Sequence, residues 1–583
     1  MNEHGIINPI WTVANPPDEA KVNEISNELG ILPATAALLL RRGCDTPKRA
    51  RAYINDESAR FFDPMRLADM PAAVKRIHEA LEKREKILIY GDYDCDGVTS
   101  TAILYDYLRI NSADVKFYIP DRIVDGYGVN AEIVKRYAAL GFKLMITVDC
   151  GVTAVDEIAL AKELGLDTVV TDHHECRKIL PDCPVVDPRR PDCPYPYKTL
   201  AGVGVAFKLI CALEADLRMT TPLNALDFAV KRYAEIITVG TIADVMPLTG
   251  ENRTIVKYGL RRLENPSNLG LRKLLVAAGA AEETFGFKLR RRMTAALVAF
   301  TIAPRINAIG RLGNAREAVE LLLTEFPERA AEISQTLCDV NEIRQQNENA
   351  IYENAELMIQ RQCRPGDRVL VVANRGWHVG VIGIVASRVT ERHYLPSILI
   401  DIDDDCKGSG RSVKGFNLVA ALEKCKDYLI SYGGHEMAAG VKLKQSEIED
   451  FRRAINKVAD EVFGDKIPEP MLEIDLELSL DELNERLAKQ LTLLEPFGTG
   501  NHQPIFKTRG MEIAEIVPLS GGRHTKLILN CQGQKFVGLW FGMKTENIRF
   551  GVGDAADVAY RLELNDFNGN PPIQLMIEDL IIH

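Results

Sequence analysis

Short apolar runs alternate with amphipathic stretches between about residues 86 and 172, and this rhythm is the clearest structural signal in the chain. The apolar runs are Lys86–Asp92, Val115–Pro120, Lys143–Asp149 and Asp167–Asp172. Their spacing of roughly 25–30 residues is typical of βαβ units and predicts a parallel sheet. Helix-end signals agree, since Thr153 with Asp156 has the spacing of a capping box and Gly165 is expected just after a helix.

A long polar segment, Pro327–Gln362, separates this region from a second α/β pattern. Its only Gly or Pro is Pro327 itself, which suits the first turn of a helix, so we predict a connecting helix. The second pattern predicts strands at Arg368–Ala373 and Ser397–Asp401 and helices at Val379–Arg392 and Leu418–Leu429.

From about Met471 the pattern changes to short strands with one helix near Leu480–Leu491, which predicts a small barrel. The predicted fold class is therefore α/β: a parallel-sheet domain, a smaller α/β domain joined to it by a long helix, and a C-terminal β-barrel. The expected domains are 1–326, with an N-terminal helical part around Ile31–Leu40, then 327–362, 363–465 and 466–583.

Composition predicts a cytoplasmic, monomeric protein without a membrane partner. The longest apolar runs, such as Ala295–Phe300, are too short to cross a bilayer, and the N-terminus lacks the pattern of a signal peptide. Twelve cysteines occur with no CxxC pair, which indicates reduced thiols. The net charge of −11 taken alone argues against a nucleic-acid partner, but an acidic protein can still present a basic groove.

Acidic residues and histidines follow the predicted strands at several separate points of the chain. They are Asp92, Asp94 and Asp96 after the first strand, Asp149 after the third, Asp172, His173 and His174 after the fourth, and Asp244 after the apolar run Ile236–Ile242. Because the carboxyl ends of parallel strands meet at one edge of a sheet, we expect these side chains to converge.

Such a cluster of carboxylates is costly unless cations neutralise it. Hard oxygen ligands with one or two imidazoles suit Mn²⁺ or Mg²⁺ better than structural Zn²⁺. Two such ions would clamp a phosphodiester and activate water, which indicates phosphoryl transfer to water. The alternative is that these aspartates are helix N-caps and strand-end turns. That alternative explains one DxD motif well, and four converging segments poorly.

Several ordered motifs resemble the DHH phosphoesterase superfamily and, within it, the RecJ family along nearly the whole chain. They are Gly91–Thr101, Pro120–Gly128, Thr147–Gly151, Thr171–His174, Leu200–Leu209, Ile242–Leu248, Pro304–Arg311, Gly376–Arg388, Ser409–Ser412, Gly433–Gly440 and Glu495–Phe506. The resemblance implies a DHH catalytic domain, a DHH-associated domain and an OB-type barrel. It also implies a single-stranded-DNA-specific 5′→3′ exonuclease of DNA repair and recombination, with two Mn²⁺ or Mg²⁺ ions.

By position in the family motifs, the implied metal ligands are Asp94, Asp96, Asp149, His173 and Asp244, with Asp149 as the bridge. The resemblance implies that His174 contacts the scissile phosphate or supports the ligands from behind. It implies that Asp92 orients a ligand or the water. Cys95 stands where the family usually has a small residue. Strand alternation would turn its side chain away from the metals, so we expect a core thiol.

The resemblance also implies a narrow cleft between the two α/β domains that admits one DNA strand. The expected substrate contacts are Arg122, Arg305, Asn307 and Arg311 on the catalytic side and Ser409, Arg411, Gly433, Gly434 and His435 on the other. Arginine forks and glycine-rich turns suit phosphate oxygens. For His378, contact with substrate and a bond to a buried carbonyl remain equally open. Trp540 is expected in the barrel core.

Two alternative functions remain. One is a DHH phosphodiesterase that acts on short oligonucleotides or cyclic dinucleotides, and the other is a non-catalytic DHH scaffold in a replication complex. The length and the Glu495–Phe506 segment favour the exonuclease over the first, and the complete set of expected ligands argues against the second. The expected partner is single-stranded DNA, and a single-strand-binding protein and a RecQ-type helicase are further candidates.

Overall fold

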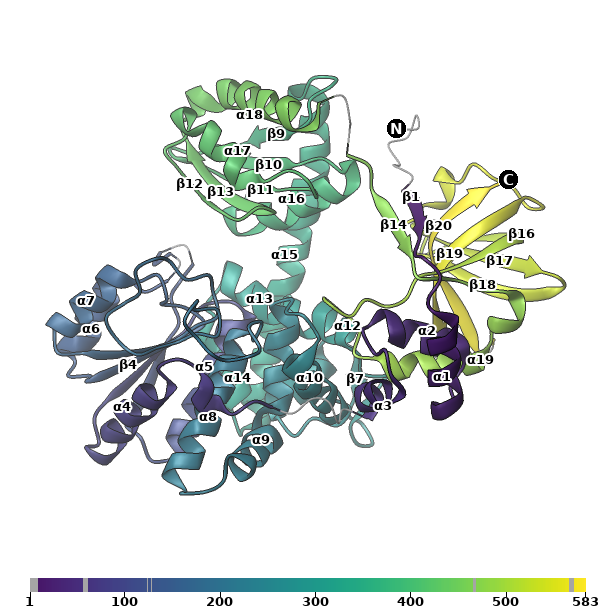
Figure 1. Cartoon of the computed structure of the whole chain (residues 1–583). Coiled ribbons are helices and arrows are strands. Elements are labelled where there is room, and N and C mark those ends of the chain that lie inside the picture. The colour runs from purple at the N-terminus through teal and green to yellow at the C-terminus, as the bar shows by residue number, and fades with distance from the viewer. Residues whose placement is uncertain (1–8, 56–60, 123, 127, 465–467, 566–570) are drawn as a thin grey trace.

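The computed structural model describes residues 9–55, 61–122, 124–126, 128–464, 468–565 and 571–583. These residues form three units, shown in Figure 1. A large α/β unit is followed by the long helix α15 (Pro327–Gln362), which leads to a smaller α/β unit, and a C-terminal barrel lies beside them. The expected boundary between 465 and 466 lies outside the described residues.

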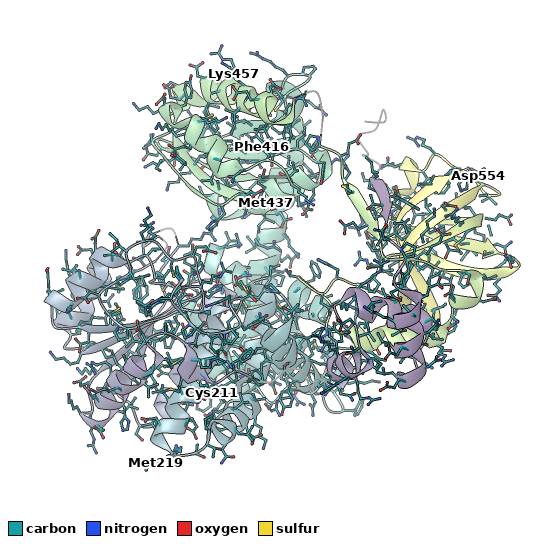
Figure 2. The ribbon with its side chains drawn as sticks, viewed as in Figure 1. Cys211, Met219, Phe416, Met437, Lys457 and Asp554 are labelled. Carbon is teal, nitrogen blue, oxygen red and sulfur yellow. The ribbon has the colours of Figure 1, made fainter. Side chains whose placement is uncertain are left out.

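The first unit is built on a parallel five-stranded sheet with the order β3-β2-β4-β5-β6. The four predicted strands are confirmed as β2 (Ile87–Tyr90), β3 (Val115–Tyr118), β4 (Leu144–Val148) and β5 (Asp167–Thr171), and β6 (Val185–Val186) completes the sheet. All residues of β2 and β4 are buried, because helices cover both faces. Figure 2 shows Cys211 within this unit and Met219 at its surface.

The helices of this unit each bury at least one face, and α5 and α8 are buried along most of their length. They are α4 (Met70–Glu82), α5 (Cys95–Ile110), α6 (Ala131–Ala139), α7 (Val155–Glu163), α8 (Gly202–Leu217), α9 (Pro222–Ala243), α10 (Gly250–Leu263), α11 (Leu269–Ala277), α12 (Ala295–Leu297), α13 (Ala303–Leu312) and α14 (Arg316–Leu323). The predicted capping box at Thr153 and Asp156 is wrong, because α7 starts at Val155 and its N-cap Ala154 makes no side-chain bond. Gly165 does follow the helix, with φ +72°.

One described helical stretch, Ala295–Leu312, has the length and mean hydropathy that a membrane span needs. The apolar run Ala295–Phe300 is by itself too short for a span, but a π-helical turn joins α12 to α13 and extends the apolar stretch. Val298, Ile302 and Ile306 are fully buried in the core of the first unit. A core helix of a globular protein meets the same two criteria, and this one packs against α9 and α15.

The second unit is a mixed sheet with the order β12-β13-β11-β10-β9. Its elements are β9 (Leu370–Asn374), α16 (Val379–His393), β10 (Ser397–Asp401), β11 (Cys406–Arg411), α17 (Leu418–Lys424), β12 (Ser431–Gly434), β13 (Ala438–Leu443) and α18 (Ile448–Phe463). The predicted strands and the first helix are confirmed within two residues. The predicted helix Leu418–Leu429 stops early, because a 3₁₀ turn at Lys426–Tyr428 follows α17.

The C-terminal unit is a closed barrel, since β16 (Phe506–Leu519) pairs with both β17 (His524–Cys531) and β19 (Ala555–Leu564). The other strands are β18 (Gln534–Trp540) and β20 (Ile573–Ile582), and β15 (Leu476–Glu477) extends the sheet beside β16. The expected short helix is α19 (Glu485–Leu491). Trp540, which was expected in the barrel core, is only half-buried and packs against the edge of that core.

The N-terminal helices share their hydrophobic core with the barrel. Val22, Ile25, Leu38 and Leu39 of α1 (Glu19–Leu29) and α2 (Pro33–Arg41) pack in one cluster with barrel residues, and α3 (Pro47–Asn55) joins them. Strand β1 (Ile10–Val13) also pairs in parallel with β14 (Met471–Ile474). The sequence-based grouping put this segment with residues 61–326, because apolar spacing identifies a helix and not the surface that it covers.

This shared core predicts how truncations behave. A chain that ends at residue 464 leaves the apolar faces of α1 and α2 without their cover, so it should bind a hydrophobic dye and self-associate. A chain of residues 61–464 lacks those helices as well and should stay monodisperse. Size-exclusion chromatography and dye fluorescence of the two proteins, side by side, test this. Equal dispersity of both truncations would contradict the shared core.

Candidate metal centre

The expected acids and histidines converge at the carboxyl edge of the first sheet. Asp92, Asp94 and Asp96 follow β2, Asp149 follows β4, and His173 and His174 follow β5. Asp244 arrives from a helix and not from a strand, since it caps the C-terminus of α9. Three groups of side chains have ligand atoms within 4.8 Å of one another: Asp92, Asp94 and Asp149; Asp96, His173 and Asp244; and Asp149, His173 and His174.

Two helix N-termini face these acids. Asp94 is the N-cap of α5, and its Oδ1 accepts hydrogen bonds from the N–H groups of Asp96 (2.9 Å) and Gly97 (3.1 Å). Asp96 accepts from the N–H groups of Gly202 (2.7 Å) and Val203 (2.8 Å) at the start of α8. The positive ends of both helices therefore stabilise carboxylates at this edge. The N-cap interpretation of Asp94 is right, and it coexists with membership of the cluster.

Asp149 has an unusual backbone that fixes its side chain at the centre. Its φ is +61°, the left-handed region that Asp and Asn tolerate better than most residues. A Cβ at Gly202 would lie 2.5 Å from Asp149 Oδ1, so only glycine allows α8 to approach this carboxylate so closely. Asp149 Oδ1 lies 3.1 Å from His173 Nε2.

The two histidines have different surroundings. His173 is buried, and its Nε2 also lies 3.5 Å from Asp244 Oδ2 and 3.8 Å from Asp96 Oδ2. His174 is less buried, and its Nδ1 lies 2.7 Å from Asp172 Oδ1. Asp172 also accepts the N–H groups of Val152, His173 and His174, which fixes the turn after β5. The ring of His174 is thus oriented from behind by a buried carboxylate.

Crowding and burial disfavour the charged state of most of these groups. Burial, followed by repulsion from Asp94, raises the pKa of Asp96 to about 7, and burial with repulsion from Asp96 raises the pKa of Asp244 to about 8. The pKa values of Asp92 and Asp149 lie well above the usual range for the same reasons. Burial lowers the pKa of His173 to about 3.

His174 behaves in the opposite way. Burial alone would lower its pKa, but the hydrogen bond and charge of Asp172 outweigh burial and raise the pKa to about 9. The same bond keeps the pKa of Asp172 below its usual range in spite of burial. Without added cations, the cluster therefore combines a His174 that favours its cationic form with carboxyl groups that resist ionisation.

The cluster fits divalent cations bound by oxygen and imidazole. Asp92 Oδ1, Asp149 Oδ1, Asp244 Oδ2 and His173 Nε2 are buried and have no hydrogen-bond partner among the described residues. Unpartnered buried acceptors are costly, and several that face one another are best satisfied by a shared cation. Carboxylate oxygens with one or two imidazoles are ligands for Mn²⁺ and Mg²⁺.

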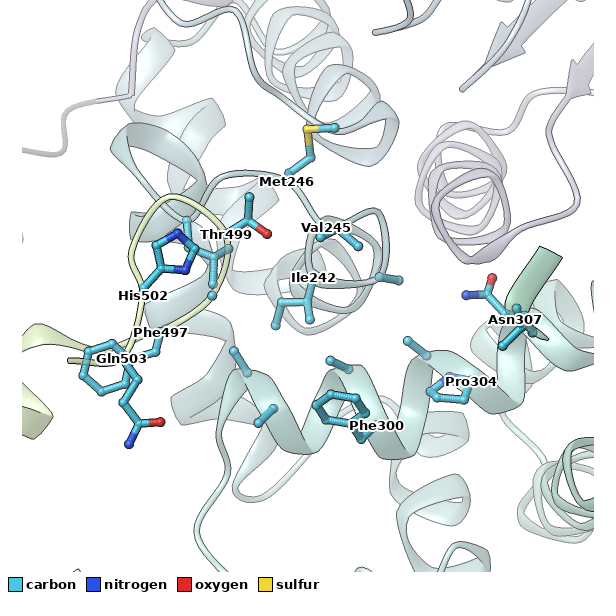
Figure 3. Close-up of a pocket in the computed structure, with 18 of the residues that line it drawn as sticks. Ile242, Val245, Met246, Phe300, Pro304, Asn307, Phe497, Thr499, His502 and Gln503 are labelled. Carbon is cyan, nitrogen blue, oxygen red and sulfur yellow. The ribbon is translucent and has the colours of Figure 1, made fainter. Parts of the chain in front are cut away.

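A cavity of about 580 Å³, drawn in Figure 3, is lined by residues on both sides of Asp244 in the sequence, although Asp244 itself does not line it. One wall is the stretch from Ala295 to Arg311, with Phe300 and Asn307, and another is Ile242–Met246, which flanks Asp244. Phe497 and His502 close it from the segment that leads into the barrel. Phe300 is 81 % exposed, which is unusual for a phenylalanine so close to a buried centre.

Three of the expected arginines gather near one another at the junction of the two α/β units. Burial, with repulsion from Arg122, lowers the pKa of Arg311 to about 10 and also lowers the pKa of Arg411. Arg311 Nη1 donates to the carbonyl of Gly380 (2.9 Å), and Arg411 Nη1 donates to Ser409 Oγ (3.1 Å). Uncompensated guanidinium groups held this way suit an anion.

Other expected contact residues have structural partners. Arg305 donates to the carbonyl of Thr301 and to Cys338 Sγ, which ties α13 to α15. Asn307 Oδ1 accepts the N–H of Cys95 and so braces the loop after β2. His378 caps α16, since its Nδ1 accepts the N–H of Gly380. The ring makes no further hydrogen bond among the described residues, to a buried carbonyl or to any other group. Gly433 and Gly434 end the exposed strand β12, where they pair with β13, and His435 begins the exposed turn that follows.

The buried position of Cys95 is confirmed, but its expected reason is wrong. Cys95 is the first residue of α5 and not a strand residue, so helix geometry and not strand alternation turns it into the core. Sequence reasoning also missed the supporting role of Asp172 and the exposure of Phe300. The motif TDHH carried a signal for the role of Asp172, whereas an apolar run carries no signal for the exposure of Phe300.

Three family models match the chain in the order of its units. The DHH family, N-terminal domain, matches residues 86–241, the DHHA1 domain matches 366–461, and the RecJ OB domain matches 474–579. A parallel sheet with acids and histidines at its carboxyl edge, followed by these two further domains, defines the class as a metal-dependent phosphoesterase of the DHH type.

Relatives narrow the class further. The chain is 38 % identical to the single-stranded-DNA-specific exonuclease RecJ of Bacillus subtilis over 98 % of this chain and 71 % of the relative. It is 31 % identical to the protein of the same name from Salmonella typhimurium over 95 % of this chain and 98 % of the relative. The chain therefore belongs to the RecJ family.

Solved structures agree with this assignment. The crystal structure of RecJ from Thermus thermophilus in complex with Mn²⁺ superposes with a TM-score of 0.82 at 32 % identity, covering 98 % of this chain and 79 % of that one. The complex of RecJ from the same organism with Mg²⁺ gives a TM-score of 0.76 at 30 % identity, with 98 % and 78 % covered.

The repulsion at the centre predicts the effect of Asp149→Asn on stability. Asparagine keeps the left-handed backbone and does not titrate, whereas a carboxyl whose pKa is raised by folding costs stability at any pH above its unfolded-state pKa, so at neutral pH the metal-free variant should melt at a higher temperature than the parent. Asp149→Ala removes the same charge but strains the backbone by about 1–2 kcal/mol, so it should melt below Asp149→Asn. Differential scanning calorimetry in EDTA compares the three proteins. A lower melting temperature for Asp149→Asn than for the parent would show that the carboxylate is not repelled.

Proposed function

We propose that this protein is a single-stranded-DNA-specific exonuclease that cuts mononucleotides from the 5′ end of a strand with the help of two Mn²⁺ or Mg²⁺ ions. The observation that carries this proposal is the set of unpartnered, buried carboxylate and imidazole atoms at the sheet edge, in a chain that belongs to the RecJ family. The RecJ structures named above were solved with these two cations. A role in DNA repair and recombination fits the same family.

Asp94, Asp96, Asp149, His173 and Asp244 are the proposed ligands. Asp149 belongs both to the group with Asp92 and Asp94 and to the group with the two histidines, which supports its role as the shared ligand between two ions. Asp92 lies within reach of the first group and suits a further ligand or a group that orients water. When bound, the ions supply Lewis acidity for the attack of water on a phosphodiester and neutralise the leaving oxygen.

The protein's own side chains hold the substrate. His174, cationic and oriented by Asp172, faces the cluster and suits a contact to the scissile phosphate. Water adds to phosphorus, the bond to the 3′ oxygen breaks, and that oxygen takes up a proton. The shortened strand keeps a 5′ phosphate, and a nucleoside 5′-monophosphate leaves.

We assign the selection of a single DNA strand to the junction of the two α/β units. Arg122, Arg311 and Arg411 converge where the two α/β units meet, and they suit the 5′-terminal phosphate. The cavity with Phe300 and Phe497 leads from Asp244 towards the barrel, and its aromatic groups can stack on bases of any sequence. The barrel contributes none of the proposed ligands, so we assign it the strand further from the cut.

Substitution of a ligand should abolish hydrolysis and spare the fold. Asp94→Ala and His173→Ala should each lower the rate by at least about a thousandfold at saturating Mn²⁺, because several kcal/mol of charge stabilisation are lost. Release of nucleotides from end-labelled single-stranded oligonucleotides measures this. The matched control is Asp156→Asn, an exposed carboxylate on α7, which should leave the rate unchanged. Near-normal turnover by folded His173→Ala protein would refute the ligand assignment.

The arginine cluster predicts a preference at the 5′ end. A 5′-phosphorylated strand should be cut faster at low concentration than a 5′-hydroxyl strand, and Arg411→Ala should remove most of that difference. A charged hydrogen-bonding partner is worth about 1.5–3 kcal/mol, which corresponds to about tenfold or more in kcat/KM. The control is Arg392→Ala, which changes an exposed arginine in the last turn of α16. Release of mononucleotides from the 3′ end would contradict the proposed polarity.

Three further expectations rest on the sequence alone. Docking of a single-strand-binding protein or a RecQ-type helicase stays a prediction, and so do the monomeric state and the cytoplasmic location. A length series of oligonucleotides separates the proposed function from a phosphodiesterase for very short substrates, since an exonuclease continues to shorten long strands.

A further inference from the structure

A second cavity, of about 630 Å³, lies at the edge strand β3. It is bounded by the loop after β3, by α6, and by the turn between α13 and α14. None of the proposed metal ligands lines it. Like the metal centre, it sits at the carboxyl end of a parallel strand, where open α/β sheets bind ligands.

Arginines dominate the lining of this cavity. Arg122, Arg136, Arg311 and Arg316 face two aspartates, Asp121 and Asp125. No ion pair joins any of the four arginines to a carboxylate in the part of the chain that the structure describes. In a protein with a net charge of −11, four such arginines around one cavity are a strong sign of an anion site.

Aromatic rings hold the outer arginines in place. The guanidinium of Arg136 lies over the ring of Tyr137 (5.7 Å) and that of Arg316 over the ring of Phe117 (5.7 Å). A guanidinium stacked on a ring keeps its N–H edges free for an anion. The N-terminus of α14, at Arg316, also borders the cavity and adds its positive end.

The two aspartates offset only part of this charge. Asp125 Oδ2 already accepts the hydroxyl of Tyr118 (2.7 Å) and the N–H of Asp121 (2.8 Å), so it shapes the loop. Tyr118 and Tyr137 add aromatic surface to the lining. Together the cavity offers charge for a phosphate and aromatic faces for a base, in a volume within the usual range of about 300–1,000 Å³ for small-ligand sites.

We propose that this cavity binds a nucleoside 5′-monophosphate, the product that the exonuclease releases. The inference rests on the proposed function, because that function supplies the ligand. Arg122 and Arg311 connect the two places, since both belong to the arginine cluster at the junction and both line this cavity. A nucleotide that leaves the metal centre thus meets Arg136 and Arg316 beyond the terminal-phosphate contacts.

The test is equilibrium dialysis of the whole protein against radiolabelled dTMP in EDTA, which removes any binding through metal ions. We expect dTMP to bind more tightly than thymidine. The double variant R136Q/R316Q should weaken dTMP binding by about tenfold or more, because two charged hydrogen-bonding partners are lost. The matched control K135Q removes a neighbouring charge on α6 that pairs with Glu132 (2.7 Å), and it should change dTMP binding by less than about twofold.

A 5′-phosphorylated oligothymidylate distinguishes the two sources of a 5′ phosphate. If the cavity serves the released nucleotide, R136Q/R316Q should weaken dTMP far more than the oligonucleotide. Equal weakening of both would overturn the proposal in favour of a site for the strand's own 5′ end. Equal binding of dTMP and thymidine, an unchanged affinity in R136Q/R316Q, or an equal loss in K135Q would also overturn it.

A separate assay of the parent with Mn²⁺ and single-stranded DNA keeps the two proposals apart. Cleavage without dTMP binding in EDTA would leave the proposed function in place and remove the product site. Absence of cleavage would remove the proposed function, and the product role with it, whatever the protein binds.

Discussion

Repulsion among five carboxylates that share one poorly hydrated space is the constraint around which the first unit is arranged. Two unit charges about 4 Å apart repel by about 4 kcal/mol at the effective dielectric constant near a protein surface. The fold offsets part of this cost with backbone dipoles, because the N-termini of α5 and α8 donate to Asp94 and Asp96. Asp149 has no such donor for its Oδ1 and lies at the centre, so this oxygen most needs a cation. The high pKa values at the centre are the signature of a site that is complete only with its metals.

Close approach of backbones is the second requirement, and it explains why particular glycines and polar groups lie where they do. A Cβ at Gly310 of α13 would lie 2.1 Å from the carbonyl oxygen of Tyr93, so glycine lets that helix press on the loop after β2. Three residues earlier, Asn307 accepts the N–H of Cys95 from the same loop. The helix α13, which lines the 580 Å³ cavity on one side, thus also fixes the loop that carries the acids on the other. A shift of α13 would move both the proposed strand path and the carboxylates.

The sequence predicted most of the catalytic edge, since a parallel sheet obliges acids that follow different strands to meet. Its failures have physical causes. Strand β11 (CKGSGR) has no β-branched or aromatic residue and is held by its neighbours β10 and β13, so no local signal marks it. The helices α1 and α2 were recognised by their spacing, but their partner lies more than 400 residues away in the barrel, and pattern alone does not identify long-range partners. The positive φ of Asp149 depends on the turn between β4 and α7, and aspartate tolerates that region without requiring it.

Acidic and basic side chains gather in different places, and this separation reconciles a net charge of −11 with a polyanionic substrate. The acids at the strand ends are turned inwards, where bound cations would reverse the local field that DNA meets. Arginines with no carboxylate partner among the described residues lie just beyond, at the junction of the α/β units and along the β3 edge. Arginine suits this place better than lysine, since its fork binds two phosphate oxygens and its charge persists when burial lowers its pKa, as it does for Arg311 to about 10. On the proposed path a phosphate would meet fixed guanidinium groups before it reached the metal centre, and the overall charge of the chain says little about the local charge along that path.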